Sequence, residues 1–436
     1  MQGGCLSAAA RLLEGAGVDE RAERFDVIVV GGGASGLAAA IAAGRAGART
    51  LVLERDVAAG LPILATGNGR CNVSNARLDP ARYRDPAWAR RVLGENPEDL
   101  LACFFDSVGL VTAEVEGRLY PVTRRAASVR DALLAEAARR GVEVVCGAEV
   151  LRAERGDAGW RIDVSAPARP VRYEGDARRA RRALSAAPRR ERTLLAHAAV
   201  LAPGGSSVAV CGLFNLAHVD EEPVLCPIAC EVAGLGAGAL SRVDGMRVEG
   251  ALTLVRAGER IFREEGEVLL RSYGISGIVS FDLSRRVRAG DVIELDLLPG
   301  FDEEGLLGHL RRREERLGAL ADAHPRAAWF DGLLVKPLAE LVLALADGSL
   351  ASVARACRAV PLTVSGLAER GQAQVRRGGI PLAAVDAGTL SVGEGLFACG
   401  EALDMDADCG GYNLAWAWTT GLIAGSSAAE TALGAR

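Results

Sequence analysis

The sequence predicts an α/β fold in which both ends of the chain build one nucleotide-binding domain, interrupted by an inserted small β-barrel and a helical subdomain. Three observations support this prediction. Near the N-terminus a glycine-rich turn, Gly31 to Gly36, follows a short apolar run. Near the C-terminus a glycine pair, Gly410 and Gly411, opens a helix. Between these two points the pattern changes to short β-like runs and then to a helical periodicity, which indicates an insertion.

The composition is that of a soluble globular protein with more than one domain. The chain has 436 residues, half of them hydrophobic, which is too many for one small core. A net charge of −5 disfavours a nucleic-acid partner. The ten cysteines are irregularly spaced, which indicates free thiols in a reducing compartment. No stretch resembles a signal peptide or a membrane span, so we expect a cytoplasmic location and no membrane partner.

The N-terminal elements occur in the order of a βαβ unit. Phe25 to Val30 is a short apolar run rich in β-branched residues, as in a buried parallel strand. An alanine-rich helix over residues 37–48 follows, and Thr50 to Leu53 forms the next strand. A helix over residues 129–140 and a strand over residues 142–145 continue the alternation.

The rest of the chain indicates the insertion and the return to the first domain. Short β-like runs suit a small barrel, a helical pattern follows, and residues 390–399 have strand character again. The predicted division is an N-terminal extension over residues 1–24, a nucleotide-binding domain over residues 25–208 and 358–436, a barrel over residues 209–300 and a helical subdomain over residues 301–357.

The N-terminal turn carries the pattern G-x-G-x-x-G between a strand and a helix. Gly31 allows the tight turn, Gly33 lets the backbone approach a pyrophosphate, and Gly36 allows close packing. The helix start offers N–H groups and a partial positive charge to phosphates. Glu54 ends the second strand, where a carboxylate accepts hydrogen bonds from a ribose. Together these residues predict a dinucleotide site.

One segment has an unusual charge. Residues 167–193 are dense in arginine, alanine and proline and show little apolar periodicity. We expect a solvated excursion between two strands, and a contact surface for a nucleic acid or another anionic partner is the alternative.

Two longer motifs carry a family resemblance. Residues 65–72 read ATGNGRCN, a loop able to lie against a planar ring, and residues 400–418 read GEALDMDADCGGYNLAWAW. Shorter matches are GRLYP at residues 117–121, the pair Gly204–Gly205, and YGISG at residues 273–277. From about residue 25 onward the chain closely resembles the BaiN-like (YhiN-type) flavoproteins, a family of NAD(P)/FAD-dependent or aminoacetone-oxidase-type oxidoreductases.

The resemblance implies a Rossmann-like FAD-binding domain of the glutathione reductase superclass. FAD would be the resident cofactor and NADH or NADPH a transient co-substrate, and no metal is expected. Glu54 would bind the adenosine ribose, the backbone of Val150 the adenine, and Glu401 or Asp404 the ribityl chain. The implied cofactor-binding residues are Gly31, Gly33, Ala34, Ser35, Gly36, Glu54, Arg55, Asn68, Gly69, Arg70, Cys71, Asn72, Val150, Gly204, Gly205, Gly400, Glu401, Asp404, Gly411, Tyr412, Asn413 and Leu414.

Catalytic residues are less well defined by the sequence. The candidates are Arg70, Cys71, Tyr120, Arg271 and Tyr273, and Arg118 joins Arg70 and Arg271 as a candidate anchor for an anionic substrate. Cys71 lacks the second cysteine of a CxxxxC disulfide reductase, so a thiol that only packs beside the flavin is the alternative to a nucleophile. The tyrosines could donate protons, but packing roles are the stronger expectation for them.

The implied function is that of an FAD-dependent oxidoreductase acting on a small organic substrate. It would reduce an activated C=C or C=N bond by hydride transfer from flavin N5. A flavin-dependent oxidase of small amines and a flavin-bound binding protein without catalysis are the alternatives. Departures from the family pattern cluster in the insert, so the cofactor is better defined than the substrate.

Overall fold

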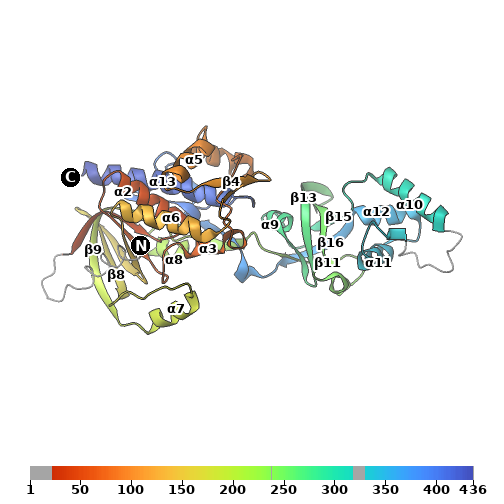
Figure 1. Ribbon diagram of the computed structural model, residues 1–436, viewed down its shortest axis with the longest axis horizontal. Coiled ribbons are helices and arrows are strands. Elements are labelled where there is room, and N and C mark those ends of the chain that lie inside the picture. Colours follow the sequence, from red (N-terminus) through yellow and green to blue (C-terminus); the bar gives the residue numbers. More distant parts are fainter. Residues whose placement is uncertain (1–21, 237, 318–328, 436) are drawn as a thin grey trace. The chain divides into compact units, whose positions relative to one another are not determined.

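The structure of the chain is a computed structural model that describes residues 22–236, 238–317 and 329–435. Two compact units form (Figure 1): unit 1 contains the chain up to Glu222 and from Val375 onward, and unit 2 runs from Pro223 to Gln374. Most of the expected N-terminal extension, residues 1–24, lies outside the described residues. Its last two residues already belong to the first strand, because β1 begins at Glu23.

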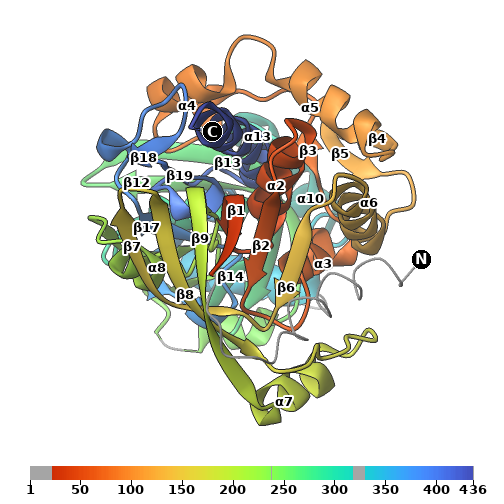
Figure 2. The same cartoon turned by 90° about the vertical axis from the view of Figure 1, so that its left-hand side faces the viewer.

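Unit 1 is organised around a mainly parallel sheet to which both chain ends contribute. β1 (Glu23–Val30) pairs in parallel with β2 (Thr50–Glu54) on one side and with β9 (Arg189–Leu201) on the other. β6 (Glu143–Cys146) pairs with β2, and β19 (Leu396–Ala398) pairs in parallel with β9. Figure 2 shows β9, β1, β2 and β6 side by side. The predicted βαβ unit and the return of the C-terminal segment to the same sheet are confirmed.

Two helices from opposite ends of the sequence pack directly on each other in unit 1. They are α2 (Ala34–Arg45) and α13 (Tyr412–Gly434), which lie along each other in Figure 1. A Cβ on Gly425 would lie 2.1 Å from the carbonyl oxygen of Ala39, and one on Gly421 would lie 2.4 Å from that of Ser35. Such distances leave no room for a side chain, so these glycines let the two backbones touch.

The remaining elements of unit 1 either complete the eight-stranded sheet, as three further antiparallel strands, or lie outside it. They are α3 (Leu61–Ala65), η1 (Thr66–Gly69), β3 (Ser74–Asn75), α4 (Pro86–Leu93), α5 (Pro97–Ser107), β4 (Thr112–Val115), β5 (Arg118–Pro121), α6 (Ala126–Arg139), β7 (Glu149–Gly156), β8 (Gly159–Pro167), α7 (Ala177–Ala186), α8 (Ser207–Leu213), β17 (Val375–Gly379), β18 (Ser391–Gly393) and η8 (Gly400–Ala402), with β10 (Val219–Val224) crossing into unit 2. Within the described residues no single helix is long and apolar enough to cross a membrane.

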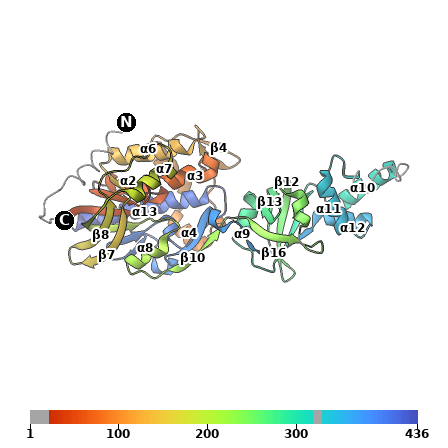
Figure 3. The same cartoon turned by 90° about the horizontal axis from the view of Figure 1, so that it is seen from below.

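Unit 2 is a closed antiparallel barrel with helices attached. Its strands follow the order β11-β14-β13-β12-β15-β16. Barrel and helices share one hydrophobic cluster, which contains Ile293, Leu306 and Val353, and Figure 3 shows α11 and α12 close to the barrel strands. The elements are β11 (Ile228–Val232), η3 (Ala239–Val243), β12 (Arg247–Arg256), β13 (Glu259–Arg271), β14 (Gly274–Ser276), α9 (Ile278–Ser284), β15 (Val292–Asp296), α10 (Glu303–Leu317), α11 (Lys336–Leu345), α12 (Leu350–Arg358) and β16 (Val360–Leu367). The predicted barrel and helical insert are confirmed.

The borders of the insert lie later in the chain than residues 208 and 357. β16 closes the barrel between β11 and β15, so it belongs to unit 2 and not to the nucleotide-binding domain. The helices α10, α11 and α12 are therefore an excursion between two barrel strands. At the other border, α8 and most of β10 still belong to unit 1. The corrected insert runs from residue 223 to residue 374.

The close contact of α2 and α13 predicts the effect of Gly425→Ala. An added methyl group would meet the Ala39 carbonyl and push the helices apart, so the free energy of unfolding should fall by about 1–3 kcal/mol. Urea unfolding followed by tryptophan fluorescence measures this change. Gly434→Ala, in the same helix but with nothing within 4 Å of the new Cβ, is the matched control. Equal loss in both variants would contradict the packing role.

Candidate functional site

The glycine turn after β1 has a different steric requirement at each of its glycines. Gly31 has a φ of +107°, and a Cβ there would lie 2.1 Å from the Ala202 carbonyl oxygen. A Cβ on Gly36 would lie 1.9 Å from the carbonyl oxygen of Gly31. Gly33, which precedes Ala34 at the start of α2, is different, because a Cβ on it would meet nothing within 4 Å. The helix start therefore opens onto free space at Gly33 alone.

Glu54 is oriented by the glycine turn itself. Its Oε2 accepts the N–H of Gly32 at 2.7 Å, and its Oε1 accepts the N–H of Asp56 at 2.6 Å. Its carbonyl accepts the N–H of Ala148 at 2.8 Å, which brings the start of β7, with the partly buried Val150, to the end of β2. The neighbouring Arg55 is exposed, with Nη2 3.4 Å from the Ser206 hydroxyl.

Glu401 faces the glycine loop that follows β9. A Cβ on Gly205 would lie 3.1 Å from Glu401 Oε1, and one on Gly204 would lie 3.9 Å from Oε2. Oε1 accepts the backbone N–H of Arg376 at 2.6 Å. Burial raises the pKa of Glu401 to about 7, against the lowering effect of the Arg376 N–H. Gly400 packs against Ser35, whose hydroxyl would lie 2.4 Å from a Cβ there, so Glu401 is held next to the start of α2.

In the loop at residues 67–72, several residues are exposed and one thiol is buried. Asn68 has a φ of +53° and Cys71 a φ of +56°, and Gly69 is also left-handed. Asn68, Gly69 and Arg70 are exposed, whereas Cys71 is fully buried. Burial raises the pKa of the Cys71 thiol to about 11. The structure therefore supports the packing interpretation of Cys71 over that of a nucleophile.

The start of α13 lies against the end of this loop. Gly411 has a φ of +100°, and a Cβ there would lie 2.4 Å from the Ser74 carbonyl oxygen and 2.9 Å from Asn72 Oδ1. No side chain caps the helix, so the N–H groups of its first turn have no intrahelical acceptor. Asn72 Oδ1 is buried and has no hydrogen-bond partner among the described residues. The start of a helix beside an unpaired buried amide oxygen fits the polar edge of a ring.

Tyr412 and Asn413 use their side chains for support, while Leu414 lies in the same first turn of α13. The buried Tyr412 packs edge-on against Tyr83, and its carbonyl accepts the Tyr83 hydroxyl at 3.0 Å. The Asn413 side chain bonds both backbone groups of Ala407 at 2.9 Å. What these residues offer to a ligand is their backbone.

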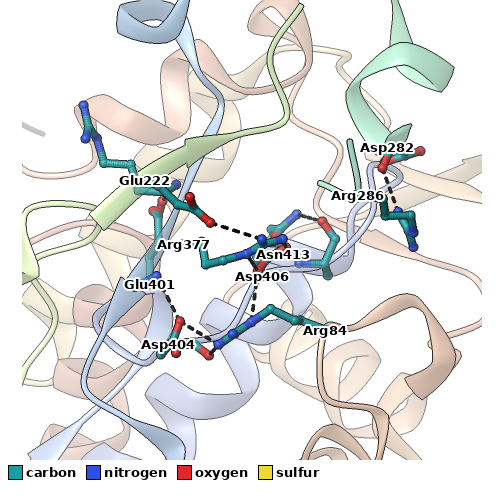
Figure 4. Close-up of polar contacts among 12 residues, drawn as sticks. Arg84, Glu222, Asp282, Arg286, Arg377, Glu401, Asp404, Asp406 and Asn413 are labelled. Atoms are coloured by element: carbon teal, nitrogen blue, oxygen red, sulfur yellow. Dashed lines mark hydrogen bonds and ion pairs between the residues drawn. The ribbon is translucent and has the colours of Figure 1, made fainter. Parts of the chain in front are cut away.

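Asp404 belongs to a network of ion pairs around Arg84 and the buried Asp406 (Figure 4). Its Oδ1 lies 2.6 Å from Arg84 Nη2 and accepts the N–H of Gly378 at 3.0 Å. Arg84 also lies 3.3 Å from the buried Asp406, which pairs with Arg377 at 2.8 Å. Arg377 in turn lies 3.2 Å from Glu222. Of the two carboxylates expected at the ribityl chain, Glu401 thus has the more suitable surroundings.

Arg84, Arg377 and Asp406 were not singled out from the sequence. A signal was present, because Asp404, Asp406 and Asp408 alternate with apolar residues in DMDAD. Alternation places these carboxylates on one side of an extended segment, where buried charges need cationic partners.

The catalytic candidates fall into two groups. In unit 1, Arg70 is exposed, Arg118 pairs in register with Asn75, and Tyr120 is buried beneath Arg124, whose guanidinium carbon lies 4.8 Å from the ring centre. In unit 2, Arg271 lies 3.5 Å from Asp244 and 5.6 Å from the ring centre of Tyr273. Burial and the neighbouring Glu369 raise the pKa of Tyr273, which lines an open cavity of about 290 Å³ on the barrel. In the described part of the chain no group of three or more acidic, histidine or cysteine side chains is arranged to hold a metal ion.

The burial of Cys71 predicts its chemical reactivity. With a pKa of about 11, the thiol stays protonated at pH 8, so iodoacetamide should not alkylate it in the folded protein. The exposed Cys103 is the internal control and should react. Peptide mass spectrometry quantifies both, with a sample in urea in which both react. Alkylation of Cys71 as fast as Cys103 in the folded state would contradict its placement.

The raised pKa of Glu401 predicts how the stability of the apoprotein depends on pH. Because the folded-state pKa of about 7 lies above the ordinary value of 4.5, the protonated form stabilises the fold fully below pH 4.5, and this contribution is lost as the pH rises through 7. We expect the Tm of the wild type to fall relative to that of Glu401→Gln between these pH values. Glu394→Gln, at an exposed carboxylate, is the control. Parallel Tm curves for wild type and E401Q would contradict the burial argument.

Comparison with known proteins agrees with this arrangement. The sequence matches the family described as HI0933-like protein Rossmann domain over residues 25–427. It is 30% identical to the 3-dehydro-bile acid delta(4,6)-reductase of Clostridium scindens, over 92% of this chain and 98% of that protein. It is 25% identical to the ribosomal RNA dihydrouridine synthase of Escherichia coli, over 91% of this chain and 96% of that protein.

A solved structure with a more distant resemblance is the 3-ketosteroid-delta4-(5alpha)-dehydrogenase of Rhodococcus jostii RHA1. Its TM-score is 0.46 at 16% identity, covering 94% of this chain and 98% of that one. The family match spans both parts of unit 1 and the insert between them, which confirms the resemblance seen in the two long motifs. The chain therefore belongs to the HI0933-like protein family, which includes the BaiN-like proteins.

Proposed function

We propose that this protein is an FAD-dependent oxidoreductase that reduces a C=C bond conjugated to a carbonyl group. One observation carries the proposal: the two chain ends bring an open glycine turn at Gly33 and an uncapped helix start at Gly411 into one unit, with an unpaired amide oxygen at Asn72. The glycine turn suits a pyrophosphate, and the helix start with the unpaired amide oxygen suits the polar edge of a planar ring.

The residues of unit 1 fit the successive parts of FAD. Residues 31–36 would receive the pyrophosphate, Glu54 the adenosine ribose and the backbone near Val150 the adenine. Glu401, beside the Gly204–Gly205 loop, would bind the ribityl hydroxyls. The loop at residues 68–72 and the first turn of α13 would hold the isoalloxazine ring between them.

When bound, FAD supplies hydride transfer to an electron-poor double bond. The chain contributes electrostatics, because the N-terminus of a 23-residue helix carries a partial positive charge that stabilises negative charge placed at it. Arg70, in the loop, and Arg118, in register with Asn75, would anchor a carbonyl or anionic group of the substrate. No residue between Glu54 and Cys71 adds a second cysteine, so a dithiol is not part of this proposal.

The choice of a C=C bond over a C=N bond rests on the relatives. One is named a bile acid delta(4,6)-reductase and the other a dihydrouridine synthase. Dihydrouridine is uridine with its C5=C6 bond saturated, and that bond is conjugated to a ring carbonyl. The two names thus describe the same bond type in chemically different molecules, which supports the reaction class. The substrate itself would be selected by the insert, where the sequence departs from the family pattern.

We further propose that the protein works in the cytoplasm with NADH or NADPH as a transient electron donor. The nine cysteines of the described chain are all free thiols, as a reducing compartment requires. The sequence has no second G-x-G-x-x-G turn after a strand, so the donor would visit the FAD site and have no site of its own.

Gly33→Ala separates FAD binding from folding. A Cβ at Gly33 meets no atom within 4 Å and its φ of −77° suits any residue, so the Tm of the apoprotein should not change. The methyl group would occupy the space that a pyrophosphate needs, so the Kd for FAD should rise by about tenfold or more. Gly212→Ala in α8, also with open space around it, should leave the Kd for FAD unchanged and should not lower the Tm. If G33A binds FAD with the Kd of the wild type, the proposal that the pyrophosphate binds at this turn is contradicted.

Anaerobic mixing of the FAD-loaded protein tests the reaction. NADH or NADPH should bleach the visible absorbance of the flavin, and an α,β-unsaturated ketone should then restore it without oxygen. Bleaching by a small amine, but by neither NADH nor NADPH, would contradict the reductase proposal and support an amine oxidase. Absence of bleaching by any donor would favour a binding protein without catalysis.

A further inference from the structure

The arginine-rich segment at residues 167–193 contains an ordered helix. It carries nine arginines and three acidic residues, a local charge of +6 in a chain whose net charge is −5. After β8 ends at Pro167, the chain forms α7 (Ala177–Ala186) and then enters β9. Asp176 caps the helix by accepting the N–H of Arg179 at 3.0 Å. The expected solvated excursion therefore contains a defined element, and Figures 1 and 2 show it at the edge of unit 1.

One face of α7 holds the helix against unit 1. Ala180 is buried in a small cluster with Val57, Ala58 and Leu61, and Ala177 and Leu184 pack against the same cluster. Arg181, beside this face, makes a bidentate pair with Asp56, with Nε and Nη2 at 2.9 and 2.5 Å from the two carboxylate oxygens. The apolar face and Arg181 thus contact other residues of unit 1, and these contacts fix which face of the helix is turned outward.

The opposite face carries arginines without partners. Arg178, Arg179 and Arg182 lie within about one helical turn of each other, with a spacing of roughly 5–6 Å between residues three or four apart. All three are exposed, as are Arg169 and Arg172 just before the helix. None of these five side chains forms an ion pair or hydrogen bond within residues 22–236, 238–317 and 329–435. Like charges at this spacing destabilise a helix, and a bound polyanion would remove that repulsion.

We propose that the outer face of α7 is a docking surface for the phosphate backbone of a nucleic acid. This α7 arginine face consists of Arg178, Arg179 and Arg182, together with Arg169 and Arg172. Guanidinium groups bind phosphates bidentately, and contacts of this kind position a nucleic acid without reading its sequence. A nucleic acid offers several phosphates over the length of one helical turn, which matches the clustered arginines.

Two other partners fit the surface less well. Helices that lie on membranes insert an apolar face, but the apolar face of α7 is already buried against residues 57–61. The core of a protein–protein interface is depleted in charged residues, and none of the large exposed hydrophobic residues of the described chain falls between residues 167 and 193. Nucleic-acid interfaces are polar and positively charged, as this face is.

Binding of the FAD-loaded full-length protein to fluorescent RNA and DNA duplexes of equal length tests the proposal, with anisotropy as the readout over a series of salt concentrations. The variant R178Q/R179Q/R182Q removes three charges and leaves Ala180, Leu184 and the Arg181–Asp56 pair in place. We expect affinity at low salt to fall by about tenfold or more and the slope of log K against log salt to become shallower by about 2–3.

The control R311Q/R312Q/R316Q removes three exposed arginines from α10 and should bind as the wild type does. Circular dichroism and FAD content confirm that the variants are folded and loaded, so failure here is distinct from failure of the reductase proposal. Absence of salt-dependent binding by the wild type, or equal losses in both triple variants, would overturn the proposal. Binding only to anionic phosphatidylserine vesicles, or only to polyglutamate as an acidic-protein mimic, would overturn it as well.

Discussion

The contact between α2 and α13 is the constraint on which the site depends. These helices come from opposite ends of the sequence. Glycines at positions 421 and 425 let their backbones approach so closely that even a methyl group would not fit between them. The same contact brings Gly400 against Ser35, and with it Glu401 beside the first glycine turn. The site is therefore assembled from both ends of the chain, and the contact between the two helices brings its parts together.

Buried charge gives the C-terminal half of the site its rigidity. Asp406 has 1% of its surface exposed and contacts both Arg84 and Arg377. Arg84 also holds Asp404, so one arginine from the N-terminal part of the chain connects two carboxylates of the C-terminal motif. An ionised carboxylate without its partner would be costly in this position, which explains why the segment between Gly400 and Gly411 can be irregular and still well defined.

Much of the fold could be predicted because its signals are local. The strand, glycine turn and helix at residues 25–48 follow one another without interruption, and the contact that requires a glycine at position 36 is with Gly31 of the same turn. The border of the barrel could not be found in this way, because β16 is recognisable as a barrel strand only by its pairing with β11 and β15. The same limit applies to Asp404: the family resemblance implied a ligand contact, but its partner Arg84 is 320 residues away in sequence. In the sequence of α7, Ala177, Ala180 and Leu184 lie among arginines, so the short apolar face that they form was not predicted.

The central claim is that the two chain ends build a single FAD site, and a crystal structure of the protein grown with FAD tests it most directly. We expect one FAD per chain, with its pyrophosphate at Gly33, its ribityl chain beside Glu401 and its isoalloxazine ring between residues 68–72 and the start of α13 at Gly411. An FAD bound elsewhere, or a site between Gly33 and Gly411 that an isoalloxazine ring cannot enter, would contradict the claim.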